Sequence, residues 1–477
     1  MAYEVVMGLE VHAELATNSK IFCACPVGYG AEANQNVCPA CAGMPGLLPV
    51  TNKKVVELAI AAGLVTNCKI SPVTTFDKKN YYYPDLSNSY QITQLYAPIC
   101  RDGYVEVRTS QGVKRIGIKQ IHMEEDAGKL THDDTLGVSL VDYNRCSVPL
   151  VEIVSKPDFR SAEEVIAYLE KLRSLLRFAG VARARFEEGS IRCDVNLSVR
   201  EKGDPNFGVR TEIKNMNSLS AIERAIAYET ERHIDAIEWG EPLIQETRRW
   251  DDAKNASFAM REKENAGDYF YFPDADLAPI EISSQWIEQV RAALPEMPDR
   301  KQERYVQEWG IRDKDAALLS QSPSLARIFE QSADLCGNPK EAANWLVGEG
   351  LALAKKHAVP IDDLELDPHK LAYLIRAVED RTLTRVNGKK LFAAIFSDDV
   401  DPEAYVKEHN LDAAVDQGAL EKLLASIVAE NPKSVADYQG GKTKALDFLF
   451  GQAMRQLKGA GDPGEIRRIL EELLRPQ

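Results

Sequence analysis

The sequence "RCDVNLSVREKGDPNFGVRTEIKN" (residues 192–215) alternates apolar and polar side chains on both sides of a turn-like segment. The apolar positions from Cys193 to Val199 share one face, because successive residues of a strand point to opposite sides. The connecting "EKGDPNF" is rich in turn residues, so we predict an antiparallel β-hairpin. Its outer face would carry Asp194, Glu212 and Lys214.

Strand and helix patterns are mixed through residues 1–293. The segment "YEVVMGLEVH" (3–12) alternates in the same way and places Glu10 and His12 on one face. The segment "SAEEVIAYLEKLRSLLRFAG" (161–180) has helical spacing, an N-cap serine and a terminal glycine. We therefore predict an α+β fold with a mixed or antiparallel sheet.

Length and composition indicate the class of protein. At 477 residues the chain exceeds what one hydrophobic core supports, so we expect two or three domains. Its 44% apolar and 27% charged residues are ordinary for a globular protein, and no apolar run reaches the length of a membrane span. We expect no signal peptide and no membrane association. Nine cysteines are an odd count in a long chain, and their distribution favours a reducing compartment, so we predict a cytoplasmic protein.

Prolines in "LPEMPDRKQERY" (294–305) mark the end of the strand-rich region. Helical spacing follows, and the pattern changes again to several short helices near residue 403. We predict a front domain at 1–293, a helical domain at 294–402 and a small helical tail domain at 403–477.

Four cysteines lie in one Gly- and Pro-containing loop, as two close pairs: Cys23 and Cys25, then Cys38 and Cys41. Two pairs at this spacing suit a tetrahedral zinc site of four thiolates. Such a site has no open position for substrate, so we predict a structural zinc in the loop 23–41. Four reduced cysteines without metal are the alternative.

Several acids and two histidines fall on polar strand faces, two residues apart or within the hairpin: Glu10 and His12, His122 and Glu124, Asp194 and Glu212. Oxygen-rich ligands favour Mg²⁺ or Mn²⁺. We predict a divalent-metal site built from this set. The alternative for each single residue is an ordinary surface acid.

Cations lie in the same region, as phosphoryl transfer requires to spread negative charge. The segment "FDKKNYYYPDL" supplies Lys78 and Lys79, and "DYNRCSVPLVEIV" supplies Arg145 together with the acid Glu152. The segment "YQGGKTKAL" (438–446) ends like a phosphate-binding loop but lacks its first glycine and a preceding strand. Any ATP site must therefore be of another kind.

The formal net charge of −15 argues against indiscriminate nucleic-acid binding. The tail nevertheless contains a basic cluster, opposed over residues 431–460 by Asp437 and Asp447: Lys433, Lys442, Lys444, Arg455 and Lys458. Such a patch suits the phosphate backbone of one RNA. A plain helical bundle is the alternative.

Many specific motifs occur in order along nearly the whole chain: "GLEVHAEL", "SKIFCACP", "VCPACAGMPGLLPV", "FDKKNYYYPDL", "IHMEEDAGK", "EIVSKPD", "RCDVNLSVR", "TEIKNMNS" and "ETRRWDD". Together they resemble the GatB/GatE family, the B subunit of the tRNA-dependent amidotransferase GatCAB. The tail, "NPKSVADYQGGKTKALDFLFGQAMRQLKG", resembles the YqeY-like domain of that family. The front domain is then its cradle-shaped catalytic domain.

The resemblance implies a ligase that uses ATP and Mg²⁺ to phosphorylate the side-chain carboxylate of Glu-tRNA(Gln) or Asp-tRNA(Asn). Ammonia then displaces the phosphate to give the amide. The catalytic residues it implies are Glu10, His12, Glu124, Glu125 and Lys79, of which the first four would bind Mg²⁺. The resemblance also places Lys79 and Tyr82 where the ammonia path enters, and Asp194, Glu212 and Lys214 in the wall of the cleft. We predict that Tyr82, Asp194, Glu212 and Lys214, together with Lys78, Arg145 and Glu152 from the pattern above, contact ATP, substrate or the channel.

The resemblance also implies partners. The chain shows no amidase or glutaminase signature, so ammonia would come from a glutaminase A subunit, joined by a small C subunit in a heterotrimer. One departure from the family pattern is Ser87 and Asn88, where the family usually has Pro and Lys. A scaffold that binds tRNA and the A subunit without chemistry is the competing interpretation.

Overall fold

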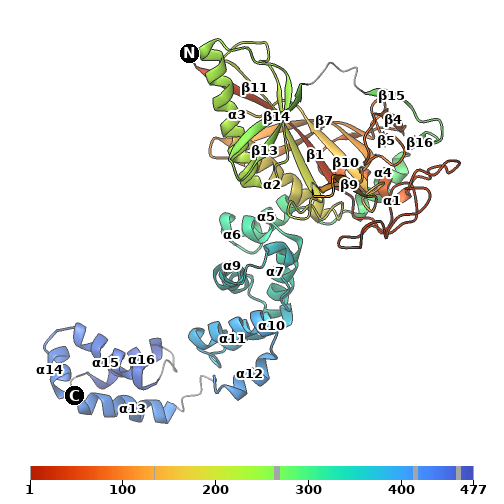
Figure 1. Ribbon diagram of the computed structural model, residues 1–477. Helices are drawn as coiled ribbons and strands as arrows, with labels where there is room; N and C mark the ends of the chain where they lie inside the picture. Colours follow the sequence, from red (N-terminus) through yellow and green to blue (C-terminus); the bar gives the residue numbers. More distant parts are fainter. Residues whose placement is uncertain (1, 134, 263–268, 412–416, 458–462, 476–477) are drawn as a thin grey trace. The chain divides into compact units, whose positions relative to one another are not determined.

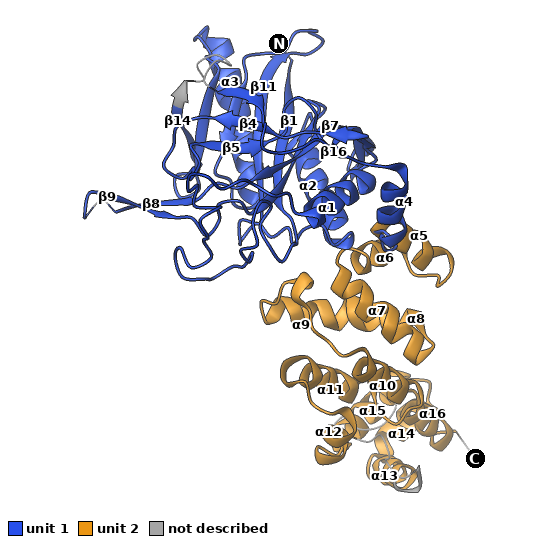
Figure 2. Cartoon of the chain, turned by 90° about the vertical axis from the view of Figure 1, so that its right-hand side faces the viewer, with its two compact units in different colours: residues 1–297 blue, residues 298–477 orange. Residues whose placement is uncertain are grey.

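The computed structural model describes residues 2–133, 135–262, 269–411, 417–457 and 463–475. The chain divides into two compact units, residues 1–297 and 298–477 (Figure 2). The first combines sheets and helices and the second is helical, so the predicted α+β fold is confirmed. Among the described residues, no helix is both long and apolar enough to cross a membrane.

A nine-stranded sheet forms the centre of the first unit, in the order β14-β13-β12-β11-β1-β10-β7-β6-β2 (Figure 1). Its strands are β1 (Tyr3–Glu14), β2 (Lys69–Ile70), β6 (Cys100–Thr109), β7 (Gly112–Glu125), β10 (Pro149–Ser155), β11 (Ile191–Glu201), β12 (Thr211–Lys214), β13 (Glu246–Asp251) and β14 (Ala256–Glu262). Neighbouring strands are antiparallel except β12 and β13, which a helix connects as a parallel pair needs.

The predicted hairpin is confirmed, since β11 pairs antiparallel with β12 and Asn196 lies opposite Glu212. Strand β1 lies between β11 and β10 and pairs with both. Leu9 and Val11 of β1 are buried, whereas Glu10 and His12 are only partly buried on the opposite face. The alternation seen in the sequence therefore separates an apolar face from a polar face.

Three helices cover the apolar face, α1 (Lys53–Val65), α2 (Ala162–Phe178) and α3 (Leu219–Trp239), and α4 (Ser284–Ala293) packs against α1. Helix α2 packs against β6, and α3 packs against β11 and α2. Helix α2 begins as predicted, because the Ser161 side chain accepts a hydrogen bond from the Glu164 amide. Gly180 follows its end with a positive φ of 65°.

Three smaller sheets complete the first unit. They contain β15 (Phe270–Pro273) with β4 (Asp77–Asn80) and β5 (Tyr90–Thr93), β16 (Ile280–Glu281) with β3 (Val73–Thr74), and β8 (Lys129–Asp133) with β9 (Val138–Asp142). Strand β5 packs against β7 of the large sheet, where Thr93 Oγ1 donates to Glu124 Oε2 over 3.2 Å. The three-stranded sheet is thereby attached at the acidic end of β7.

The second unit contains α5 (Pro298–Gln307), α6 (Asp313–Leu319), α7 (Pro323–Cys336), α8 (Pro339–Asn344), the π-helical turn η1 (Trp345–Gly350), α9 (Leu351–Lys356), the 3-10 turn η2 (Ile361–Asp363), α10 (Pro368–Glu379), α11 (Arg385–Asp398), α12 (Pro402–Glu408), α13 (Gln417–Glu430), α14 (Pro432–Gln439), α15 (Lys444–Gln456) and α16 (Pro463–Leu473). One apolar cluster runs from Tyr305 to Leu411, and a separate one from Leu420 to Leu474. The first includes Val406 of α12. The domain limits at 294 and 403 stay predictions.

Candidate active site

A row of alternating imidazoles and carboxylates crosses the polar face of the large sheet. The register places His12 of β1 opposite Glu152 of β10, and Glu152 opposite His122 of β7. His12 Nε2 lies 3.3 Å from Glu124 Oε1 and 3.6 Å from Glu152 Oε2. His122 Nε2 lies 2.6 Å from the same oxygen of Glu152. These four residues form the imidazole cluster.

Charge governs protonation in the imidazole cluster. Burial alone would lower the pKa of His12, but the charge of Glu152 and hydrogen bonds to Glu124 and Glu152 raise it well above its usual value. Burial is outweighed in the same way at His122, whose pKa rises to about 10. Without metal, two imidazolium groups therefore balance two carboxylates in this cluster.

The donor atoms of His12, Glu124 and Glu152 all lie within 4.8 Å of one another. Two carboxylate oxygens and one imidazole nitrogen at this separation can reach a single divalent ion. Glu124 is buried and the other two are partly buried. The structure thus groups His12 and Glu124 of the predicted metal set with Glu152, which was predicted to bind ATP, substrate or a channel.

A second group, the carboxylate cluster, consists of Glu10, Asp194 and Glu212. Their carboxylate oxygens also lie within 4.8 Å of one another. Lys214 Nζ donates to Glu212 Oε1 over 3.0 Å and closely to Asp194. Burial, followed by the charges of Glu152 and Glu212, raises the pKa of Glu10. The structure therefore groups Glu10, a predicted metal ligand, with Asp194 and Glu212, whereas the predicted ligands His12 and Glu124 are grouped with Glu152.

Glu125 is not brought together with either cluster. It follows Glu124 on one strand, so its side chain points to the other side. Its carboxylate accepts hydrogen bonds from the Ile92 amide over 2.9 Å and from Ser147 Oγ over 2.7 Å. It lines a small pocket with Cys41 and Asn88. Its predicted role as a metal ligand stays a prediction.

The predicted cations of β4 have close neighbours. Lys78 Nζ lies 2.7 Å from Asp276 Oδ2. Lys79 Nζ lies over two aromatic rings, 5.4 Å from the centre of Tyr81 and 4.8 Å from that of Tyr269. An ammonium group over an aromatic face is attracted by the electron-rich ring.

Two other predicted residues lie at the edge of this region. Tyr82 is 94% exposed, so its ring is open to solvent. Arg145 donates to the carbonyl oxygens of Ala127 and Gly128 over 3.0 and 2.9 Å, and Asp126 lies 3.4 Å away. These contacts hold the turn after β7.

Sequence reasoning missed Tyr271 of β15 and Asn196 of β11. Burial, then the charge of Glu152, raises the pKa of the Tyr271 hydroxyl. Tyr271 lies on β15, which pairs with β4 although nearly 200 residues separate the two strands in the chain. No local sequence pattern therefore predicts the position of Tyr271. Asn196 Nδ2 donates to Glu10 Oε1 over 2.9 Å. Asn196 could have been predicted, because it follows Asp194 by two residues and therefore lies on the same face of the strand.

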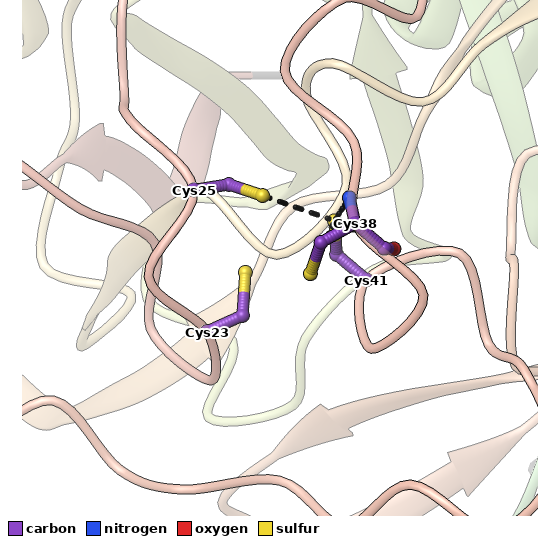
Figure 3. Close-up of side chains that lie close together, drawn as sticks. All are labelled: Cys23, Cys25, Cys38 and Cys41. Atoms are coloured by element: carbon purple, nitrogen blue, oxygen red, sulfur yellow. Dashed lines mark hydrogen bonds between the residues drawn. The ribbon is translucent and has the colours of Figure 1, made fainter.

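The four loop cysteines converge (Figure 3). All sulfurs lie within 4.8 Å of one another, with Cys41 Sγ 3.9 Å from that of Cys38 and 4.0 Å from that of Cys25. Tetrahedral zinc with bonds of about 2.3 Å separates its sulfurs by about 3.8 Å. A hydrogen bond from Cys23, with smaller help from the Cys38 amide and Lys20, lowers the pKa of the Cys41 thiol. The loop is compatible with zinc.

The basic residues predicted in the tail are exposed wherever the structure describes them: Lys433, Lys442, Lys444 and Arg455. Lys458 lies outside the described residues. Lys442 Nζ pairs with Asp437 over 2.9 Å, and Asp447 pairs with Arg467 over 2.7 Å. Both acids that oppose the cluster are thus partly neutralised.

Known proteins match this chain along its length. The family described as the GatB/GatE catalytic domain matches residues 5–288, and that described as the GatB domain matches residues 327–474. The aspartyl/glutamyl-tRNA(Asn/Gln) amidotransferase B subunit of Lachnoclostridium phytofermentans is 53% identical over 99% of both chains. The proteins of the same name from Lachnospira eligens and Carboxydothermus hydrogenoformans are 52% and 47% identical, again over 99% of both chains. The resemblance noted in the motifs is confirmed, and the chain belongs to the GatB/GatE family.

Proposed function

We propose that this chain is the subunit of a tRNA-dependent amidotransferase that activates a tRNA-borne carboxylate with ATP and amidates it. Its substrates are Glu-tRNA(Gln), Asp-tRNA(Asn) or both. Its relatives carry the name of that subunit at about 50% identity over the full length. The observation that supports a catalytic role most directly is the convergence of His12, Glu124 and Glu152 on the polar face of the sheet.

The reaction has two balanced steps. A side-chain carboxylate oxygen attacks the γ-phosphorus of ATP, the bond to the β-phosphate oxygen breaks, and ADP leaves. Ammonia then attacks the carbonyl carbon of the acyl phosphate, inorganic phosphate leaves, and a proton is lost as the amide forms. Activation is needed because a free carboxylate has no adequate leaving group.

His12, Glu124 and Glu152 would hold Mg²⁺, since their donor set and spacing fit one hard divalent ion. When bound, Mg²⁺ supplies Lewis-acid stabilisation of phosphate oxygens and alignment for in-line transfer. His122 keeps Glu152 oriented through the 2.6 Å contact of Nε2 with Oε2. The carboxylates thus stay aimed at one point on the sheet.

Lysines supply the remaining positive charge near the phosphates. Lys214 lies at the carboxylate cluster, and Lys79 lies against a wall of Tyr81 and Tyr269. The rings of Tyr269 and Tyr271 are 6.4 Å apart, so the tyrosine wall extends from Lys79 toward the acidic clusters. Aromatic walls exclude water, which protects an acyl phosphate from hydrolysis.

Ammonia comes from an A subunit, and a small C subunit completes a heterotrimer. The tail docks the tRNA backbone through Lys433, Lys442, Lys444 and Arg455, which are exposed. The cysteine loop holds a structural zinc. All nine cysteines are free, which suits a reducing cytoplasm where translation takes place.

The test is amidation by the assembled complex with ammonium chloride as the nitrogen donor, on each misacylated tRNA separately. Glu124→Gln should lower ATP-dependent amide formation by about a hundredfold or more, while tRNA binding and assembly persist. Glu106→Gln, at an exposed position of β6, is the matched control. Full activity of Glu124→Gln would favour a scaffold that performs no chemistry.

A further inference from the structure

A fully buried lysine lies beside the cysteine loop. Lys20 is 0% exposed. Its Nζ donates to Cys41 Sγ over 3.5 Å and to the carbonyl oxygen of Tyr143 over 3.3 Å. No carboxylate of the described residues forms an ion pair with Lys20. A buried ammonium is costly unless an anion lies close to it, so Lys20 needs a negative charge that no described Asp or Glu provides.

The cysteine loop provides this negative charge when zinc is bound. Its four sulfurs converge within 4.8 Å of one another (Figure 3). Four thiolates bring four negative charges to one Zn²⁺, so two of them remain uncompensated. Cys41 is the buried cysteine of the four, and its sulfur also accepts from the Cys38 amide over 3.3 Å. Lys20 therefore contacts the ligand that water reaches least.

The main chain holds Lys20 between two segments. The Lys20 amide donates to the carbonyl oxygen of Cys25 over 3.0 Å, and the following amide, that of Ile21, donates to the carbonyl oxygen of Ser147 over 2.9 Å. These two residues thus connect the cysteine loop with the segment from Tyr143 to Ser147. The Lys20 side chain connects the same two segments again, through Cys41 and Tyr143.

Packing alone does not account for a charged group at this position. An apolar side chain would fill the same space without the cost of removing an ammonium from water. Groups that hydrogen-bond to metal ligands orient those ligands and tune the metal. On the basis of the proposed structural zinc, we propose that Lys20 is a positioning residue of that centre. Its ammonium offsets negative charge at Cys41 and ties this ligand to the Tyr143 carbonyl. Ser147, at the end of the tied segment, donates to Glu125 over 2.7 Å, so the zinc loop also supports the wall that carries Glu125.

Cobalt bound in place of zinc to the full-length chain tests this role. Co²⁺ held by thiolates gives a charge-transfer band from sulfur in the near ultraviolet, and the wild type should show it. Lys20→Met keeps an unbranched side chain but removes the ammonium. Its band should shift to longer wavelength, because a sulfur without the N–H donor transfers charge to Co²⁺ at lower energy. Its zinc affinity, measured by competition with a chromophoric chelator, should fall by about 10- to 100-fold.

Ile21→Val is the matched control, because it shortens the neighbouring buried side chain and leaves the ammonium in place. It should keep the wild-type band and zinc affinity. Hydrogen exchange of α2 peptides reports whether Lys20→Met is folded; where it is not, Lys20→Gln removes the charge instead and should show the same fall in zinc affinity.

Two results would overturn the role of Lys20 while the zinc centre stands. The first is an unshifted band with unchanged zinc affinity in Lys20→Met. The second is an equal change in Lys20→Met and Ile21→Val, which would indicate packing rather than charge. A wild type without any sulfur band would reject the proposed zinc centre, and the role of Lys20 with it.

Discussion

A buried charge network joins α3 to β12 and β13, and it makes stability depend on pH. Glu229 and His233 of α3 are fully buried. Glu229 accepts from Arg232 Nε and from Arg248 Nε, over 2.9 and 3.0 Å. His233 Nε2 pairs with Thr211 Oγ1 over 2.9 Å, while its Nδ1 has no partner among the described residues. A proton added at Nδ1 therefore finds no acceptor among the described residues, and the nearest carboxylate oxygen to Nε2, Glu229 Oε2, lies 3.8 Å away.

The sign of the effect follows from the charges around the ring. Burial, then the positive charge of Arg232, lowers the pKa of His233 from 6.5 to about 4. Glu229 opposes this shift and Arg248, itself paired with Glu246, adds to it. Between pH 6.5 and pH 4 the unfolded chain binds more protons than the folded chain. The stability due to neutral His233 is thus complete above pH 6.5 and is lost as the pH falls.

The magnitude is about 3 kcal/mol at pH 4, because each tenfold difference in proton affinity between the folded and unfolded chain corresponds to about 1.4 kcal/mol. His233→Gln keeps a side-chain amide near Thr211 but does not titrate. Hydrogen exchange of α3 peptides, compared between wild type and variant at pH 7.5 and pH 4, isolates the effect, because intrinsic exchange rates cancel. The protection of the variant relative to wild type should rise roughly a hundredfold on acidification.

His132→Gln, at an exposed position of β8, is the matched control and should show no such change. Equal pH dependence in wild type and His233→Gln would refute the reasoning. That result would mean that the network accommodates a protonated ring after all.

Three further predictions concern zinc, packing and RNA. Cys41→Ser should lower zinc from about one atom per chain to almost none by elemental analysis; unchanged zinc would place the metal elsewhere. Gly63→Ala should cost roughly 1–3 kcal/mol in denaturant unfolding of the first unit, because the added carbon would lie 2.4 Å from Cys100 Sγ; unchanged stability would contradict this. Lys433→Ala with Lys442→Ala should reduce the salt dependence of tRNA binding by roughly two phosphate contacts; an unchanged slope in salt titrations would remove the tail patch from the RNA interface.

Local patterns sufficed to predict β1, the hairpin of β11 and β12, and the caps of α2. The alternation around Leu9 and Val11 depends only on which side of a strand is buried, and that is visible in the sequence. The Ser161 cap and Gly180 stop depend on backbone donors and acceptors close by in the chain. Such features require no knowledge of the tertiary structure.

Grouping the acids required the register between strands, which sequence spacing does not contain. Glu10 and His12 share a face of β1 as expected, but their partners are on different neighbouring strands. Glu10 lies opposite Asp194 of β11, and His12 lies opposite Glu152 of β10. Neighbouring Glu124 and Glu125 looked equivalent in the sequence but point to opposite sides of β7. The position of Tyr271 opposite Lys79 depends on the pairing of β15 with β4, two strands that are distant along the chain.

The most direct test of the account is the anomalous difference map of a crystal of the assembled complex soaked in Mn²⁺ and a non-hydrolysable ATP analogue. The account predicts a manganese peak within bonding distance of His12, Glu124 and Glu152, next to the γ-phosphate. A nucleotide bound away from these residues, with no manganese among them, would contradict it.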